Sequence, residues 1–270
     1  MTSATARTIL ICSGKGGVGK TTLTANLGIA LARLGHPGAV LDADFGLRNL
    51  DLLLGLENRI VYTAQEVLSE SCRLEQALVR HKQEPNLSLL PAGNPRMLEW
   101  LTPDDMRKVA SLVGEQSRAE AWISACLARH AEIARQAQAW ARRPRVYFEE
   151  WDEPMISAIR WVSELVHAAG GEDVFPELAV ASMGRDRVIA DPLEPARRAP
   201  DLIVGSWCGK KFRPEKVAAR PGWADVPAVR GGWLHEIKSC DILQPGPAAL
   251  TDGLEQLHRL FAAWAARATD

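Results

Sequence analysis

The sequence predicts an α/β protein with a parallel sheet in its N-terminal half, joined through a long helix to a second α/β lobe. Three patterns predict this class: a strand, glycine loop and helix over residues 8–34, apolar residues at helical spacing over residues 117–141, and alternating strand and helix patterns beyond residue 143. Such alternation is typical of parallel sheets covered by helices. The 270 residues provide enough core for one large or two small domains.

A glycine-rich loop lies near the N-terminus, where residues 13–22 read SGKGGVGKTT. This is the G-x-x-x-x-G-K-[ST] pattern of a phosphate-binding loop. Its glycines let consecutive backbone N–H groups turn onto phosphate oxygens, and the helix that follows points its positive end at them. Lys20 is expected to hold the β- and γ-phosphates and Thr21 the Mg²⁺ ion. The predicted nucleotide contacts are Gly14, Gly16, Gly17, Val18, Gly19, Lys20, Thr21 and Thr22.

The segments on either side of the loop have the order that such a loop requires. Residues 8–12, TILIC, are a short apolar run of strand type, and residues 23–34 have a helical pattern that ends at Gly35 and Pro37. The alternative is a glycine turn that binds no ligand. It is disfavoured because the loop, the lysine, the hydroxyl and both flanking elements occur together.

An additional lysine, Lys15, makes the loop resemble the deviant Walker A loop of the MinD/ParA family of ATPases. The segment LDADFGLRNLD at residues 41–51 resembles the switch I segment of that family, and residues 58–62 and 89–93 also read as they do there. The resemblance implies a P-loop fold that binds ATP and Mg²⁺.

The same resemblance implies roles for individual residues. Lys15 would reach across a nucleotide-sandwiched homodimer, in which Asn49 also takes part, to the partner's phosphates. Asp44 would help to place the attacking water, and Asp42 would lie near the Mg²⁺ ion. Phosphoryl transfer needs charge neutralisation and in-line positioning of water, so lysines, a metal and a carboxylate are the expected parts. The alternative for both aspartates is that they cap a turn at the end of a strand.

The resemblance to the MinD/ParA family stops after about Met106. The family continues with a Walker B strand and a D-x-P-A-G turn, and the sequence contains no D-x-P-A-G after Gln116. Of nine tryptophans only Trp100 precedes residue 110, which predicts a junction between Asp104 and Ser117. We therefore expect a P-loop half-domain over residues 1–110, a connecting helix over 111–142 and a second lobe over 143–270. Without a Walker B segment we expect nucleotide binding with weak or absent hydrolysis, and whether the chain is an ATPase stays open.

The second part begins with a long amphipathic helix. Trp122, Cys126, Ile133, Ala137 and Trp140 recur at three-, four- and seven-residue steps, which predicts a helix over residues 117–141 with a length of about 37 Å. Residues 143–151 (RPRVYFEEW), 201–209 (DLIVGSWCG) and the Pro-Gly-Pro at 245–247 resemble the cobalamin-type periplasmic binding proteins, in which one long helix joins two lobes. The resemblance covers residues 110–270, the connecting helix and C-terminal lobe alone, and implies a Rossmann-like lobe.

Strands are predicted at residues 146–148, 202–204 and 234–237, and helices at 155–168, 191–198 and 248–266. The ligand-site candidates are Glu149, Trp151, Trp207 and Cys208, which follow strand ends. Tryptophan offers a large flat face with one N–H, which suits a macrocycle such as cobalamin. The alternative is that these tryptophans pack in the core or at its rim. Half of the cleft is missing, because the facing lobe of the family is replaced.

The apolar strand VYFEE at residues 146–150 ends in two acids, as a Walker B strand does. One hypothesis is therefore that it docks beside the glycine-loop strand and directs Glu149 or Glu150 at the Mg²⁺ ion.

Composition excludes several other classes of function. The net charge is −1 and no basic cluster interleaved with aromatic residues occurs, so no nucleic-acid partner is expected. No signal peptide or apolar run of 18 residues is found, which predicts a cytoplasmic protein. Five scattered cysteines indicate neither disulfides nor a zinc site. The stripe Leu254, Leu257, Phe261 and Trp264 suits core packing, which we favour, or membrane contact.

Three functions stay open on the sequence. The first is a MinD/ParA-like ATP-binding module, the second is a cobalamin-type ligand-binding protein, and the third is a folded hybrid, natural or designed, with neither activity. Nucleotide binding ranks first because the glycine loop is complete, whereas the ligand cleft is half built.

Overall fold

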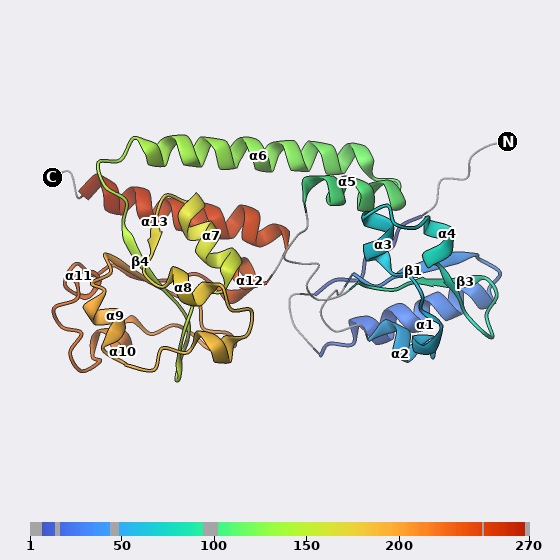
Figure 1. The fold of residues 1–270 in the computed structure, drawn as a ribbon, viewed down its shortest axis with the longest axis horizontal. Coiled ribbons are helices and arrows are strands. Elements are labelled where there is room, and N and C mark those ends of the chain that lie inside the picture. Colours follow the sequence, from blue (N-terminus) through green and yellow to red (C-terminus); the bar gives the residue numbers. More distant parts are fainter. Residues whose placement is uncertain (1–6, 14–16, 44–48, 94–101, 245, 268–270) are drawn as a thin grey trace. The chain divides into compact units, whose positions relative to one another are not determined.

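The computed structural model describes residues 7–13, 17–43, 49–93, 102–244 and 246–267. The chain divides into two compact units, Met1–Ile123 and Ser124–Asp270, and each is an α/β unit with its own sheet (Figure 1). The boundary between the units falls inside helix α6 (Gln116–Gln138).

The first unit contains a small sheet with helices. Its elements ahead of α6 are α1 (Lys20–Arg33), β1 (Gly38–Leu41), α2 (Leu50–Leu53), the 3₁₀ turn η1 (Glu57–Arg59), α3 (Ala64–Leu68), α4 (Leu74–Ala77), β2 (Val79–Arg80), β3 (Leu87–Leu90) and α5 (Pro103–Leu112). The strand order is β1-β3-β2, with β1 parallel and β2 antiparallel to β3. A Cβ atom on Gly28 of α1 would lie 2.8 Å from Val40 Cγ1, so α1 packs closely on this sheet.

Helix α1 ends where the sequence predicts. Gly35 follows it with φ +85°, a conformation that glycine adopts without the steric cost of a side chain. The His36 N–H donates to Leu31 O and the Gly35 N–H donates to Ala32 O, both at 3.0 Å. This pair of bonds is the Schellman motif, which satisfies the last carbonyl groups of the helix.

The strand predicted at residues 8–12 is wrong: residues 7–13 are described and form no strand. Strand β3 pairs with β1 along one edge and, at Ser88 and Leu89, with β2 along the other, and residues 8–12 pair with no strand among those described. Ile9 and Leu10 are 60% and 81% exposed. An apolar run predicts a strand only where a neighbouring strand is available to pair with it.

Helix α5 lies across the predicted junction and packs on the first unit. Thr102 and Asp105 form a capping box at its start. Lys108 Nζ donates to Leu68 O at 2.6 Å and pairs with Glu70 at 2.8 Å, which ties α5 to the end of α3.

The second unit is larger and has a mixed sheet. After α6 its elements are β4 (Arg145–Asp152), β5 (Met155–Ser157), α7 (Arg160–Ala168), β6 (Glu172–Asp173), α8 (Pro176–Ala179), the 3₁₀ turn η3 (Gly184–Arg187), α9 (Glu194–Arg197), β7 (Leu202–Gly205), α10 (Pro214–Ala218), α11 (Pro227–Arg230), β8 (Leu234–Glu236), α12 (Ser239–Ile242), the π-helical turn η4 (Ala249–Gly253) and α13 (Leu254–Arg267). The strand order is β5-β4-β7-β8, with β6 also paired to β4.

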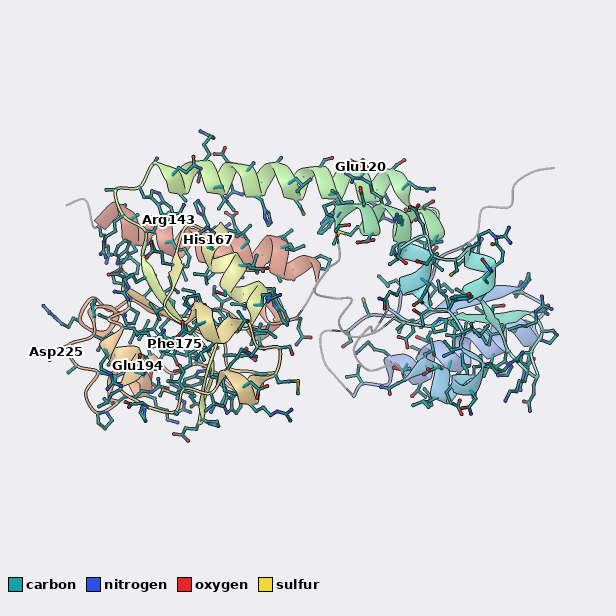
Figure 2. All side chains as sticks on the ribbon, viewed as in Figure 1. Glu120, Arg143, His167, Phe175, Glu194 and Asp225 are labelled. Atoms are coloured by element: carbon teal, nitrogen blue, oxygen red, sulfur yellow. The ribbon has the colours of Figure 1, made fainter. Side chains whose placement is uncertain are left out.

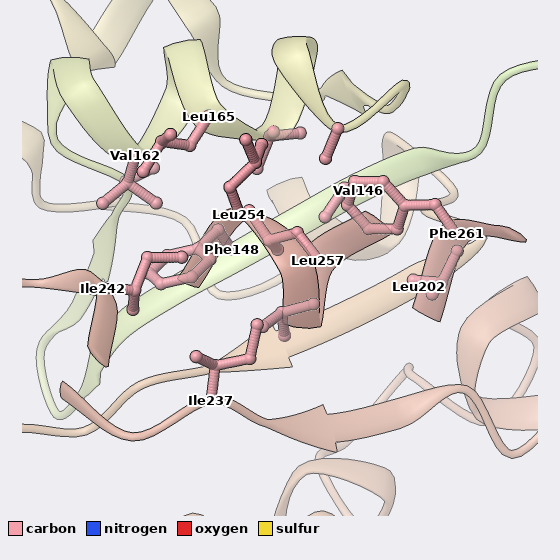
Figure 3. Close-up of a cluster of buried hydrophobic side chains, with 14 of the residues drawn as sticks. Val146, Phe148, Val162, Leu165, Leu202, Ile237, Ile242, Leu254, Leu257 and Phe261 are labelled. Atoms are coloured by element: carbon pink, nitrogen blue, oxygen red, sulfur yellow. The ribbon is translucent and has the colours of Figure 1, made fainter. Parts of the chain in front are cut away.

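Strand β4 is the centre of this sheet. It runs parallel to β7 along one edge, and β6 and then β5 pair with it along the other. Val146 and Phe148 face a core cluster with α7 and α13, which includes Val162, Leu257 and Phe261 (Figure 3). Tyr147 lies in a second cluster, with Phe175, Phe212 and Trp223, on the opposite face.

The strands predicted at residues 146–148, 202–204 and 234–237 are confirmed as β4, β7 and β8. The helix predicted at residues 155–168 is wrong in its first part, because Met155–Ser157 forms β5 and α7 begins at Arg160. Asp152 pairs directly with Met155, so residues 153–154 form a two-residue turn that returns the chain antiparallel to β4. The helix predicted at 191–198 is the short α9.

Helix α6 confirms the predicted long helix, with Ile133 and Ala137 buried, and Trp140 stacks on His258 beyond its end with ring centroids 5.5 Å apart. Helix α13 confirms the one predicted at 248–266. Leu254, Leu257, Phe261 and Trp264 are all buried, so core packing of this stripe is confirmed. Among the described residues, no helix combines the length and apolar character that crossing a membrane requires.

Candidate functional site

The described part of the glycine loop has the backbone form that phosphate binding needs. Gly17 and Gly19 both have positive φ, +73° and +85°, and α1 begins immediately afterwards at Lys20. Chain neighbours aside, no atom of the described residues lies within 4 Å of a Cβ built on either glycine, so the requirement for glycine comes from the backbone angles. Gly14, Lys15 and Gly16 lie outside the described residues.

No capping side chain and no acidic residue lies at the start of α1. Its N-cap residue is Gly19, which makes no side-chain capping bond, and the first turn carries no acidic residue. The amides of a first helical turn need acceptors, and the helix dipole favours a negative charge there. Lys20 and Thr21 are half-buried in this turn, and Val18 and Thr22 are exposed. A triphosphate with its Mg²⁺ ion therefore fits the donors and the hydroxyl that this end of the helix presents.

Asp42 directly follows β1 and is buried. Its N–H donates to Leu90 O at 3.2 Å, and its Oδ2 accepts from the N–H of Leu50, at the start of α2, at 3.4 Å. Asp42 thus makes the turn-capping contact that was the alternative to metal binding, and its role near Mg²⁺ stays a prediction. Asp44 lies outside the described residues. Across the ranges that the structure describes, no three His, Cys, Asp or Glu side chains gather to hold a metal ion.

In the second unit, the carboxyl ends of β4 and β7 carry a buried charged network. Glu149 is 0% exposed and pairs with Arg220 through two bonds, Nη1 to Oε2 at 2.6 Å and Nη2 to Oε1 at 3.0 Å. The Trp207 indole N–H donates to Oε1 and the Tyr147 hydroxyl donates to Oε2, each at 3.0 Å. Burial and the negative charge of Glu149 raise the pKa of Tyr147 well above its usual value, so the hydroxyl stays a donor.

These contacts overturn the hypothesis that β4 serves as a Walker B strand. Its edges pair with β5, β6 and β7, so it does not dock beside the glycine loop. Both oxygens of Glu149 are bonded inside the second unit, and Glu150 pairs with Arg187. An acidic strand end alone does not distinguish a metal ligand from a carboxylate that pairs with a buried cation.

Next to this network lies a cluster of lysine and tryptophan side chains. Lys210 Nζ lies 4.3 Å from the ring centroid of Trp151 and 5.0 Å from that of Trp207. It also bonds to Asp152, whose second oxygen pairs with Lys216 at 3.2 Å. Burial raises the pKa of the Asp152 carboxyl, but the bonds from Lys210 and Lys216 outweigh burial and lower that pKa below its usual value. Trp151 is half-buried and Cys208 is exposed.

Trp207 is 4% exposed, and its indole N–H is already donated to Glu149. This is the packing arrangement that was the alternative to ligand contact. Trp151 donates its indole N–H to Glu153 O at 2.9 Å and keeps part of its ring accessible. The two tryptophan rings therefore both lie near Lys210, and Trp151 is the more accessible of them.

A surface pocket of the second unit lies beside α7, where Figure 2 labels His167. Ser163, Glu164, Glu172, Asp173 and Pro176 complete its lining. Burial raises the pKa of Asp173, and the bonds to Ser163 and to the N–H of Phe175 only partly oppose this. Sequence patterns did not indicate this pocket.

Sequence reasoning also missed Arg220, Lys210 and Arg187. Arg220 lies 71 residues after Glu149 and Lys210 lies 58 residues after Asp152. The sequence contains only an indirect indication of these residues. An acidic residue at the end of a strand that will be buried needs a cation to pair with. It does not indicate which cation.

Comparisons with known proteins divide the chain in two. A family model described as periplasmic binding protein matches residues 97–239. A second model, described as ParA and as an NUBPL iron-transfer P-loop NTPase, matches residues 4–76. Both resemblances expected from the sequence are thereby confirmed.

A Guillardia theta protein that carries the MinD name is 62% identical over 108 residues, which are 40% of this chain and 40% of its own length. The septum site-determining protein MinD of a Synechocystis strain is 59% identical over 103 residues, 38% of this chain and 39% of that protein. The chain thus spans about 40% of the length of the curated relatives it matches.

Solved structures resemble both parts. A periplasmic binding protein from Veillonella parvula is 23% identical, with a TM-score of 0.48, over 60% of this chain and 56% of that one. The vitamin B12 binding protein BtuF of Vibrio cholerae is 17% identical, with a TM-score of 0.44, over 60% of this chain and 62% of that one. The MinD cell division protein of Aquifex aeolicus is 45% identical, with a TM-score of 0.32, over 39% of this chain and 40% of that one.

Proposed function

We propose that the first unit of this chain binds ATP with Mg²⁺. The chain belongs to the periplasmic binding protein family through residues 97–239, and it is a chimera with a MinD/ParA-type N-terminal region. The observation that carries the proposal is the backbone of the glycine loop. Gly17 and Gly19 are left-handed directly before α1, which starts at Lys20 without a side-chain cap. A helix start that follows a glycine loop in this way is the arrangement that binds phosphate oxygens in P-loop proteins.

Each residue of the loop has a role in this proposal. Lys20 holds the β- and γ-phosphates as a charge-assisted donor, and Thr21 supplies its hydroxyl to Mg²⁺. Asp42 acts near the metal. Lys15 reaches the phosphates of a second copy across the nucleotide, and Asp44 helps to place the attacking water. A protein that binds ATP in this way works in the cytoplasm, where that nucleotide is available.

Hydrolysis is proposed to be weak or absent. After residue 110, the apolar strand considered as a Walker B strand is β4, which carries Glu149 and Glu150. Both carboxylates pair with arginines of the second unit. The nucleotide site therefore has no carboxylate from that strand to orient the metal and the water.

The first test is a titration of the protein with a fluorescent ATP analogue, with and without Mg²⁺. Lys20→Ala is expected to weaken binding at least about tenfold, because it removes a charge-assisted donor from the phosphates. Lys82→Ala is the matched control, since Lys82 is an exposed lysine of the same unit outside the loop. Wild-type protein that shows no saturable, Mg²⁺-dependent binding would overturn the proposal.

The nucleotide-sandwiched homodimer is tested separately. Mass measurement in solution with ATP and Mg²⁺ is expected to show association that Lys15→Ala abolishes, while that variant still binds nucleotide. ATP-dependent association that Lys15→Ala leaves unchanged would contradict the role of Lys15.

A second candidate function is binding of a flat ligand of the cobalamin class by the second unit. The observation that favours it is the half-buried Trp151 ring beside Lys210 at the carboxyl ends of the strands. Cobalamin added to the protein would then quench tryptophan fluorescence saturably, and Trp151→Ala would remove this while Trp122→Ala would not. Failure of both titrations would leave the third possibility, a folded hybrid with neither activity.

A further inference from the structure

Lys210 places its ammonium group against two tryptophan rings and a carboxylate. Its Nζ lies 4.3 Å from the ring centroid of Trp151 and 5.0 Å from that of Trp207, and it donates to Oδ1 of Asp152. The face of an aromatic ring attracts a cation through its quadrupole, and tryptophan does so most strongly. The rings of Trp151 and Trp207, together with Oδ1 of Asp152, are called the ammonium cage below.

The cage is held in place by bonds that do not involve its lysine. The indole N–H of Trp151 donates to Glu153 O at 2.9 Å, and the indole N–H of Trp207 donates to Glu149 at 3.0 Å. The Trp207 ring also packs edge-to-face on Phe212, with ring centroids 5.0 Å apart. These contacts orient both rings independently of the cation, and such preorganisation lowers the cost of binding one.

The Asp152 carboxylate needs a cation at the position that Lys210 fills. Its side chain is 1% exposed, and a buried carboxylate is costly without a partner. Lys216 bonds to the other oxygen, Oδ2, at 3.2 Å. Removing Lys210 therefore takes the donor from Oδ1, while the acid keeps one of its two cations.

The side chain of Lys210 reaches the cage from the surface. It is 39% exposed, so part of the path from its backbone to the cage borders solvent. Cutting this side chain back to Cβ would leave a space with the shape of the removed atoms. A propylammonium ion has the same chain of three carbons and one nitrogen, so it matches that space in both shape and charge.

We propose that the ammonium cage is a binding site for protonated primary alkylamines, and that Lys210 of the same chain occupies it in the free protein. A ligand of this class exchanges with Lys210. Tethering gives Lys210 a high effective concentration at the cage, so the wild type binds a free amine at least about tenfold more weakly than a variant without this lysine. The site is independent of the functions proposed above, since its test uses neither nucleotide nor cobalamin.

Tryptophan fluorescence of the full chain, titrated with n-propylammonium chloride, tests the site, with sodium chloride at equal ionic strength as the baseline. Lys210→Ala should show a saturable change with a dissociation constant on the order of 10 mM, as suits so small a ligand. The wild type should need at least about tenfold more ligand. n-Propanol, which has a similar shape and no charge, should give no saturable change in either protein.

Lys210→Met and Lys211→Ala are the matched controls. Methionine fills most of the path of the lysine without a charge, so Lys210→Met should bind no propylammonium. Lys211 is the exposed lysine next in the chain, and its removal leaves Lys210 in the cage, so Lys211→Ala should behave as the wild type does. Adding Asp152→Asn to Lys210→Ala should weaken binding about tenfold or more, because the charge-assisted bond to the carboxylate is lost.

A folded Lys210→Ala variant that shows no saturable response to propylammonium overturns the proposal. An equal response to n-propanol also overturns it, since the space would then select for apolar shape and not for charge. If Lys210→Ala does not fold, the wild-type titration decides. Saturation on the order of 0.1 M then supports the site, and a response no different from that to sodium chloride up to about 1 M overturns it.

Discussion

Glu149 and Arg220 form a two-pronged ion pair in the interior of the second unit, with Arg220 Nη1 2.6 Å from Glu149 Oε2 and Nη2 3.0 Å from Oε1. The side chains of these residues are 0% and 16% exposed. Both oxygens of the carboxylate also accept from aromatic donors. Removing one member of such a pair leaves the other as an uncompensated buried charge.

Glu149→Leu is therefore expected to lower the free energy of unfolding of the second unit by about 3–5 kcal/mol, because it strands the guanidinium of Arg220. Glu149→Leu combined with Arg220→Met should recover most of this loss, since both charges are then absent. Urea unfolding measures the free energy of unfolding of the wild type, the single variant and the double variant. Glu153→Gln, at a site whose side chain is 77% exposed, should change stability by less than about 0.5 kcal/mol. A double variant no more stable than the single one would contradict the pairing as the cause.

The Asp152 carboxyl gives the second unit a dependence on acid. Lys210 and Lys216 hold its pKa below the usual 3.8, so the folded state binds fewer protons than the unfolded state there. The stabilisation is present above pH 3.8 and is lost as the pH falls through the lowered pKa. The free energy of unfolding of Asp152→Asn, measured against pH, should not show the loss of stability that this carboxyl causes in the wild type at low pH. Equal slopes for variant and wild type below pH 3.8 would show that Asp152 does not contribute it.

Gly205, the last residue of β7, lies against Phe212. A Cβ atom there would lie 1.9 Å from Phe212 Cδ2, closer than any real contact. Gly205→Ala should therefore cost about 1–3 kcal/mol in thermal or urea unfolding, because the buried ring must move. Gly38→Ala, also in a strand but with open space around its Cβ, should be neutral or slightly stabilising. Equal effects of the two changes would refute the close approach.

Gly19 and Gly35 flank α1 with the same φ of +85°. Alanine at either position would be strained by the positive φ by about 1 kcal/mol, so both variants should lose a similar amount of stability. Only Gly19→Ala should also weaken binding of the ATP analogue, because Gly19 belongs to the phosphate loop. Nucleotide binding that falls equally in both variants would mean that stability, not the loop backbone, controls the measurement.

Local sequence patterns correctly predicted the helices and strands that are determined by their own residues. The helix after the glycine loop is fixed by Gly35, and the strands β4, β7 and β8 are apolar runs that any α/β sheet would bury. Predictions failed where the outcome depended on distant residues. Residues 8–12 pair with no strand among the described residues, and Met155 joins the sheet because Asp152 pairs with it.

The candidate sites divide in the same way. The positive φ values of Gly17 and Gly19 follow from the loop motif itself. The pairing of Glu149 with Arg220 and of Asp152 with Lys210 joins residues 71 and 58 positions apart, so periodicity and spacing could not reveal it.

Alternation along β4 makes this strand intolerant of changes in length. Val146 and Phe148 belong to one core cluster and Tyr147 to the other, and Glu149 meets Arg220 on the Tyr147 side. Inserting or deleting one residue would exchange the faces of every residue beyond it and press a carboxylate into the cluster around Phe261. The exposed turn at Glu153 and Pro154 carries no such constraint. Evolution or engineering of this unit should therefore change chain length at that turn and keep β4 at a fixed number of residues.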